Sequence, residues 1–227
     1  MIFGISIVVL DWIIHILHFT VFLPIVLIAI RFSNHTRAER WYMFTLILHL
    51  TAGLSSVLLY QNNINPNYGG STFAIVAVIF YALFFQHALE LGSKKKVLYL
   101  VAGAHFLFSI CNLIWIQKET INTYSSISLS VIIISLSLIF FYRLLKKLPT
   151  DNLLSLPLFW FITAEFMTNT GQMLMKSFAH FLINIFNDNL IMLWIFHHGL
   201  GIAGNLFITY GAWLVFSRPR AGATRAN

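Results

Sequence analysis

Residues 94–117 read KKKVLYLVAGAHFLFSICNLIWIQ, and this stretch joins three lysines to 21 residues without Asp, Glu, Lys or Arg. A helix needs about 20 apolar residues to cross the hydrocarbon core of a bilayer. The whole chain has the same character, because 59% of its 227 residues are hydrophobic and only 9% are charged. Soluble domains carry about a quarter charged residues. The composition therefore indicates an integral membrane protein.

The hydrophobic runs predict an all-α, polytopic membrane protein, with a bundle of seven transmembrane helices in residues 1–217. The predicted helices are 4–31, 40–60, 71–92, 97–117, 125–146, 154–186 and 190–217. The first run lacks a charged segment before it, so we interpret it as a retained helix rather than a signal peptide. The sixth run exceeds one straight span, and we expect a kink near Gly171 or an exit from the membrane near Ser177. Residues 218–227 are predicted to form a disordered basic tail.

The positively charged residues favour one orientation of this bundle. Twelve of the fourteen Lys and Arg residues fall in the tail and in connections on one side, and only Lys118 and Lys176 fall on the other. Cytoplasmic loops are enriched in Lys and Arg. We therefore expect the N-terminus outside and the C-terminus in the cytoplasm, in a bacterial inner membrane. Topology explains the net charge of +7, so no nucleic-acid partner is expected, and the single Cys111 excludes an intrachain disulfide.

Five predicted helices carry polar or small residues three, four or seven positions apart, which places them on one helix face. These stripes comprise Asp11, His15 and His18; His49, Gly53 and Ser56; His105, Ser109 and Asn112; Glu165, Asn169, Gln172, Lys176 and His180; and Trp194, His198, Gly201 and Asn205. Polar and small residues also hold membrane helices together, which is the simpler explanation for each stripe alone. However, an ionisable side chain costs about 3 kcal/mol at the centre of a bilayer on insertion scales, and it commonly marks a functional site.

Stripes that face one another would line a polar cavity that opens to the outside. The predicted ligand-binding residues are Asp11, His15, His18, Glu165, Asn169, Gln172, Trp194, His197, His198 and Asn205. Imidazoles titrate near physiological pH, so this cavity could sense protons as well as a ligand. Glu165 is expected to be neutral or paired with a histidine. Binding would shift the last two helices between two packings, and the glycines that permit close approach are Gly171, Gly199, Gly201 and Gly204.

Some of the same residues also suit a metal ion. The candidate ligands are His15, His18, His49, His105 and Glu165. A haem would need two histidines at matching depth on facing helices, which His49 and His105 could supply. Zinc and haem therefore both stay open as cofactors. Neither is favoured, because histidine pairs with the spacing of His15 and His18 recur often by chance. Retinal is not expected, because the last predicted helix has no Lys for a Schiff base.

The last third of the chain contains several short motifs. They are PLFWF at 157–161, TGQ at 170–172, LWIFHH at 193–198, Asn205, and GAW at 211–213. Together these motifs resemble small uncharacterised bacterial seven-helix membrane proteins, which are similar to the membrane input domains of some histidine kinases. The resemblance implies a signal-input role and a cytoplasmic C-terminus that leads to an output. Because no kinase follows the last predicted helix, the resemblance implies that the output partner is a separate protein.

A second resemblance gives an alternative function. Residues 164–170, AEFMTNT, look like a segment of the seven-helix alkaline ceramidases, which implies a metal-dependent membrane hydrolase with histidine ligands and an activated water. This chain departs from that family, because adjacent His197 and His198 stand in place of His-x-x-x-His in the last helix. Adjacent residues point about 100° apart on a helix. A transporter or channel is the second alternative, although the sequence has no inverted repeat of the kind that such folds often show.

The function expected from the sequence is therefore a membrane sensor or signalling module, in preference to an enzyme. It would bind a ligand or protons in the outward-facing, His-rich cavity and pass its state to a partner. The expected partners are the lipid bilayer, a cytoplasmic or membrane signalling protein and, as a further candidate, a second copy of the chain.

Overall fold

The computed structural model describes residues 20–30, 32, 35–64, 67–117, 123–147, 152–186 and 190–218. At 60, 67–70, 179–186 and 190–195 the description covers the backbone alone. Within these ranges every regular element is a helix, as the sequence predicts. The predicted tail lies outside them from residue 219 onward, and so does the predicted first helix before Thr20.

The helices follow the hydrophobic runs closely. The described chain begins with a short apolar helix, Thr20–Ile30. The long helices that follow are α2 (Arg37–Gln61), α3 (Asn67–Ala88), α4 (Lys95–Cys111), α5 (Thr123–Lys147), α6 (Pro157–Phe186) and α7 (Leu190–Ser217). Shorter turns are 3₁₀ helices at Gly92–Lys94 and Leu153–Ser155 and a π-helical turn at Asn112–Ile116, which extends α4.

Five of these segments are long and apolar enough to cross a membrane. They are Arg37–Leu59, Ser71–Ala88, Gly92–Ile116, Thr123–Lys147 and Phe196–Ser217. Length and composition therefore support a multi-pass membrane protein. The count of seven spans and the orientation of the termini stay predictions.

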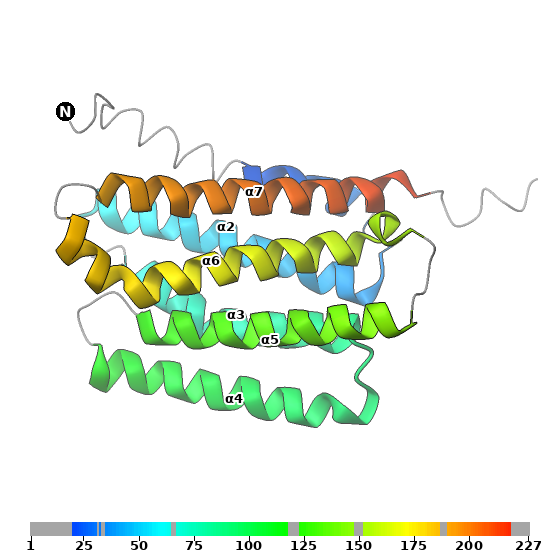
Figure 1. Ribbon diagram of the computed structural model, residues 1–227, viewed down its shortest axis with the longest axis horizontal. Helices are drawn as coiled ribbons and strands as arrows, with labels where there is room; N and C mark the ends of the chain where they lie inside the picture. The colour runs from blue at the N-terminus through cyan, green and yellow to red at the C-terminus, as the bar shows by residue number, and fades with distance from the viewer. Residues whose placement is uncertain are drawn as a thin grey trace, which may run out of the picture.

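The long helices lie roughly parallel to one axis and alternate in direction (Figure 1). Helix α2 packs against α3, α3 against α4 and α5, α5 against α6, and α6 against α7. The alternation brings the starts of α2 and α4 and the end of α5 to one end of the bundle (Figure 1). We call it the basic end, because Arg37, Lys95 and Lys147 lie there.

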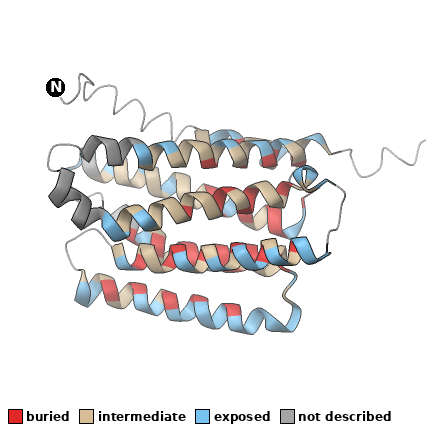
Figure 2. Ribbon diagram, in the orientation of Figure 1, coloured by how far each residue is buried: buried red, intermediate tan, exposed pale blue. Residues whose placement is uncertain are grey.

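Burial divides each helix into an inner and an outer face (Figure 2). Aromatic rings fill much of the interior: the ring of Tyr42 stacks on that of Phe161 at a centroid distance of 4.5 Å and contacts that of Phe84 at 4.9 Å. Large apolar side chains such as Leu100 and Trp115 on the α4 side are instead exposed. An exposed apolar surface of this kind suits contact with lipid.

Glycines bring α6 and α7 close together at three levels. A Cβ atom at Gly171 would collide with the side chain of Leu200, and one at Gly204 would collide with Thr168. At Gly211 the added atom would lie 2.7 Å from the Phe161 ring. Two of the glycines predicted to permit close approach, Gly171 and Gly204, therefore do so. A Cβ at Gly199, which was also predicted, would meet nothing within 4 Å.

Candidate functional site

A buried carboxylate on α6 is the centre of a hydrogen-bond network that joins four helices. Glu165 is 6% exposed, and its two oxygens accept three hydrogen bonds. Tyr42 of α2 donates to Oε1 at 3.0 Å, and Tyr81 of α3 donates to Oε2 at 2.7 Å. Asn169, one turn further along α6, also donates to Oε2, at 3.0 Å. Ser130 of α5 completes the network by donating to Asn169 Oδ1 at 3.1 Å.

We call Tyr42, Tyr81, Ser130, Glu165 and Asn169 the Glu165 cluster. Local structure explains how it forms, because residues four apart on a helix lie one above the other. The Asn169 amide therefore reaches the Glu165 backbone carbonyl, at 2.9 Å, as well as its carboxylate. Both tyrosine rings are almost completely buried, so their hydroxyls need partners within the protein. The cluster thus satisfies its polar groups inside an apolar bundle.

The charge state of Glu165 determines which hydrogen bonds this cluster can make. An ionised carboxylate only accepts, and three donors point at it. A protonated carboxyl must itself donate one bond, so at least one tyrosine or amide group would have to turn or leave. The cluster is therefore an arrangement whose contacts between α2, α3 and α6 depend on one proton.

His49 lies next to this cluster without bonding to the carboxylate. Its Nδ1 is 3.1 Å from the Thr45 carbonyl, which can only accept, so Nδ1 carries a proton. Its ring packs on Phe73 at 4.3 Å and meets the edge of Tyr81 at 6.3 Å. The sequence predicts a neutral Glu165 or a histidine partner for it. The described hydrogen-bond partners of the carboxylate are two tyrosines and an asparagine, and a neutral Glu165 stays a prediction.

The other predicted ligand-binding residues are only partly brought together. Asp11, His15 and His18 lie outside the described residues, and of Trp194 only the backbone is described. The rings of His197 and His198 lie 5.2 Å apart, edge to face, near the start of α7. Gln172 is half-buried on α6, and Asn205 of α7 donates to Thr20 at 2.7 Å. A cavity shared by all of them stays a prediction.

The stripe on α6 continues beyond the cluster toward the end opposite the basic end. The Lys176 ammonium donates to the hydroxyl of Ser126 on α5. This contact and the bond between Ser130 and Asn169 join the polar stripe of α6 to α5 at two levels.

His105 on α4 forms a second buried network. Its Nε2 lies 3.3 Å from the carbonyl of Ala74, which can only accept, so Nε2 carries the proton and also lies 3.2 Å from Ser109 Oγ. Its Nδ1 then accepts from Ser128 of α5 at 3.0 Å. The imidazole therefore links α3, α4 and α5. Both ring nitrogens of His105 are therefore engaged in hydrogen bonds within the protein. Binding a metal ion through His105 would break at least one of these bonds.

Metal candidates are spread across the fold. Among the residues that the structure describes, no three His, Cys, Asp or Glu side chains come together as a metal site. His49 and His105 each bond a backbone carbonyl through one ring nitrogen. His15 and His18 lie outside the described ranges, so zinc or haem binding that involves them stays open.

Replacing His105 with leucine should lower the free energy of unfolding by about 1–3 kcal/mol, because the buried Ser109 and the half-buried Ser128 lose a hydrogen-bond partner. Reversible unfolding in detergent micelles, followed by tryptophan fluorescence, measures the loss. Ser135→Ala is the matched control, since Ser135 is exposed and, among the described residues, its hydroxyl bonds Val131 of its own helix. The difference in free energy of unfolding between His105→Leu and Ser135→Ala should be the same with and without a metal chelator. Dependence of the difference on added zinc would instead show that His105 binds metal.

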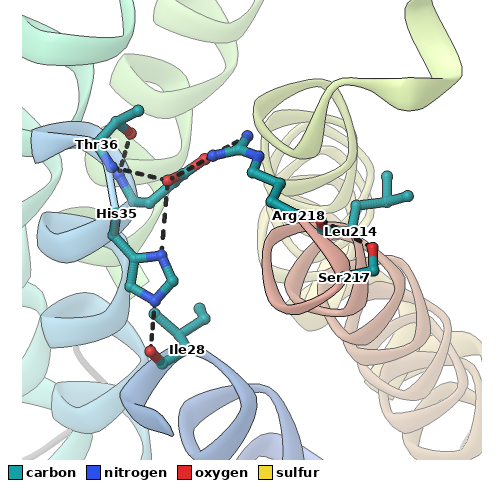
Figure 3. Close-up of polar contacts among 7 residues, drawn as sticks. Ile28, His35, Thr36, Leu214, Ser217 and Arg218 are labelled. Atoms are coloured by element: carbon teal, nitrogen blue, oxygen red, sulfur yellow. Dashed lines mark hydrogen bonds and ion pairs between the residues drawn. The ribbon is translucent and has the colours of Figure 1, made fainter. Parts of the chain in front are cut away.

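A second buried carboxylate, Glu39 near the start of α2, is missing from the predicted site residues. It accepts from the Thr36 backbone N–H at 2.9 Å and pairs with Arg218, just beyond α7 (Figure 3). A signal for it exists in the sequence, because Thr36-Arg37-Ala38-Glu39 has the spacing of a capping box. The structure confirms that motif, since the Glu39 N–H also donates to Thr36 Oγ1 at 3.3 Å.

Comparison of the chain with models of protein families, with curated proteins and with solved structures found no match. The resemblances to histidine kinase input domains and to alkaline ceramidases therefore stay expectations. A function must therefore be argued from the buried polar networks, and among the described residues the Glu165 cluster is the network that joins the most helices.

Proposed function

We propose that the protein is a sensor in a bacterial inner membrane that responds to protons or to a small polar ligand. In this proposal the N-terminus lies outside and the C-terminus lies in the cytoplasm, as the distribution of Lys and Arg favours. The observation that carries the proposal is the Glu165 carboxylate, buried and held by donors from three helices. Buried ionisable groups in membrane bundles are commonly functional.

The proposed mechanism begins with a change of charge at Glu165. When the carboxylate gains or loses a proton, its bonds with Tyr42 and Tyr81 must rearrange, which biases α6 between two positions. Helix α6 cannot move alone, because Gly204 and Gly211 of α7 pack directly against it. The movement therefore reaches α7, which runs on to the basic end of the bundle.

In the proposal, the ligand binds to residues that lie beyond Glu165 on the outer side. In the proposed orientation Gln172, His197 and His198 lie between the carboxylate and the outside, since α6 runs outward and α7 returns. An anionic or hydrogen-bonding ligand held there would change the field at Glu165 and so bias the same equilibrium. The output partner is a separate protein or a second copy of the chain.

The test follows the purified protein in lipid nanodiscs by tryptophan fluorescence and hydrogen exchange while the pH is varied. Wild type should show a reversible transition that includes α6 and α7, and Glu165→Gln should abolish it because glutamine cannot change charge. The double variant His197→Ala/His198→Ala should lose or shift the ligand response. Ser135→Ala is the control. An unchanged titration in Glu165→Gln would refute the proposal.

Bound metal separates this proposal from the hydrolase alternative. The purified wild-type protein should contain far less than about one zinc or iron per chain, the amount that a catalytic site requires. Elemental analysis and a visible absorption spectrum measure it directly. Stoichiometric zinc, or a haem band, would overturn the sensor proposal and make His15, His18 and His49 the first ligands to substitute.

A further inference from the structure

The contact between Glu39 and Arg218 connects two helix ends that are far apart in the sequence. The Arg218 guanidinium approaches the carboxylate with both terminal nitrogens: Nη2 lies 2.9 Å from Oε1, and Nη1 donates to Oε2 at 3.2 Å. Such two-pronged pairs are both strong and specific in geometry. The pair therefore holds the end of α7 against the start of α2 at the basic end (Figure 3).

The two partners differ sharply in how they are held. The Glu39 side chain is 1% exposed, and the Thr36 N–H fixes it as part of the capping box of α2. The Arg218 side chain is 39% exposed and follows the last residue of α7, Ser217. Arg218 can therefore leave for water or lipid headgroups, whereas Glu39 remains buried at the start of its helix.

The imidazole of His35 lies beside the Glu39 carboxylate. The His35 Nε2 bonds the carbonyl of Ile28, in the last turn of the helix Thr20–Ile30, so that nitrogen carries a proton. Its Nδ1 lies 3.9 Å from Glu39 Oε2 and has no hydrogen-bond partner among the described residues. A neutral His35 with its proton on Nε2 presents only a lone pair at Nδ1, so Arg218 is the cation that stabilises the Glu39 charge. Opening of the pair therefore leaves the Glu39 carboxylate with the Thr36 N–H as its donor.

We propose that Glu39 and Arg218 form a clasp, which holds the end of α7 on α2 when closed and lets that end move when open. This inference rests on the proposed function in one respect. In that function the clasp would control the end of α7, through which the sensor passes its state to a partner. Its existence depends on the geometry at the basic end, and not on what Glu165 senses. The fixed half is on α2, and the movable half follows α7.

Hydrogen exchange of the last turn of α7 in nanodiscs tests the clasp at a single pH, without any ligand. Arg218→Gln and Glu39→Gln should each raise the exchange rates of the Leu214–Ser217 amides by about tenfold or more, because local opening sets those rates. Glutamine at 39 keeps an oxygen for the Thr36 N–H, so the start of α2 should stay protected. The double variant should exchange no faster than either single variant, since both remove the same contact.

Arg143→Gln is the matched control. It removes a positive charge from the same end of the bundle, but the Arg143 guanidinium donates to the Leu89 carbonyl and not to Glu39. Exchange at the end of α7 should therefore match wild type. Three results would each overturn the clasp. They are equally faster amide exchange in Arg143→Gln and Arg218→Gln, additive effects in the double variant, and unchanged exchange in Arg218→Gln.

The outcome is separable from that of the sensor. The same Arg218→Gln comparison made in a Glu165→Gln background should give the same acceleration, because the clasp needs no change at Glu165. A failed clasp with a lost pH transition in Glu165→Gln would leave the sensor standing. An intact clasp with an unchanged transition would refute the sensor alone.

Discussion

Glu165→Leu is expected to lower the free energy of unfolding by about 2–5 kcal/mol, from three buried donors that lose their acceptor at about 0.6–1.7 kcal/mol each. The donors are Tyr42, Tyr81 and Asn169. Reversible unfolding in bicelles measures the loss. Glu165→Gln should cost less, because the amide keeps one oxygen that accepts.

Two further variants decide whether the lost hydrogen bonds are the cause. Adding Tyr42→Phe and Tyr81→Phe to Glu165→Leu should recover much of the lost stability, because fewer buried donors then lack an acceptor. Gln172→Leu, a half-buried change on the same helix, should alter stability by less than about 1 kcal/mol. Stability of Glu165→Leu equal to that of Gln172→Leu would contradict the prediction.

Gly211→Val should lower the free energy of unfolding by about 3 kcal/mol, the upper part of the range for overpacking. Its Cβ would lie 2.7 Å from the Phe161 ring and 3.2 Å from the Pro157 carbonyl oxygen. The ring cannot simply turn aside, because it is fully buried and stacks on Tyr42. Helices α6 and α7 must therefore separate, and thermal or detergent-induced unfolding should report it.

Gly103→Val is the matched control for that substitution. Gly103 lies inside α4, where an added Cβ would meet nothing within 4 Å, so valine there should be close to neutral. The displaced Phe161 should also disturb Tyr42, and through it Glu165, so Gly211→Val should alter the pH transition as well. A Gly211→Val protein as stable as Gly103→Val would show that the two helices pack less closely than described.

Helix positions could be predicted from the sequence because the hydrophobic runs are long and end in charged or turn residues. Stripes within one helix could be predicted for the same reason: helical spacing alone places Asn169 over Glu165 and Ser109 beside His105, and both contacts are observed. The π-helical turn at Asn112–Ile116 was not predicted, since hydropathy does not distinguish one helical pitch from another.

The partners across helices could not be predicted. Tyr42 and Tyr81 carry no charge and occur inside ordinary apolar runs, so nothing in the local pattern assigns them to Glu165. Which helices are neighbours depends on packing, and packing here depends on Phe161 and the glycines of α7. Arg218 was assigned to the tail, yet it is placed by a carboxylate 179 residues earlier in the chain.

The Glu165 cluster also has a consequence for how the protein is made. The chain reaches Tyr42 and Tyr81 long before Glu165, which follows Tyr81 by 84 residues. At about 5–20 residues per second a ribosome needs roughly 4–17 seconds to cover that interval. During this time a nascent hairpin of α2 and α3 enters the bilayer with two hydroxyls whose carboxylate has not been synthesised. Insertion of α6 is therefore the step that supplies the acceptor for both hydroxyls, and before it α2 and α3 should remain open to rearrangement.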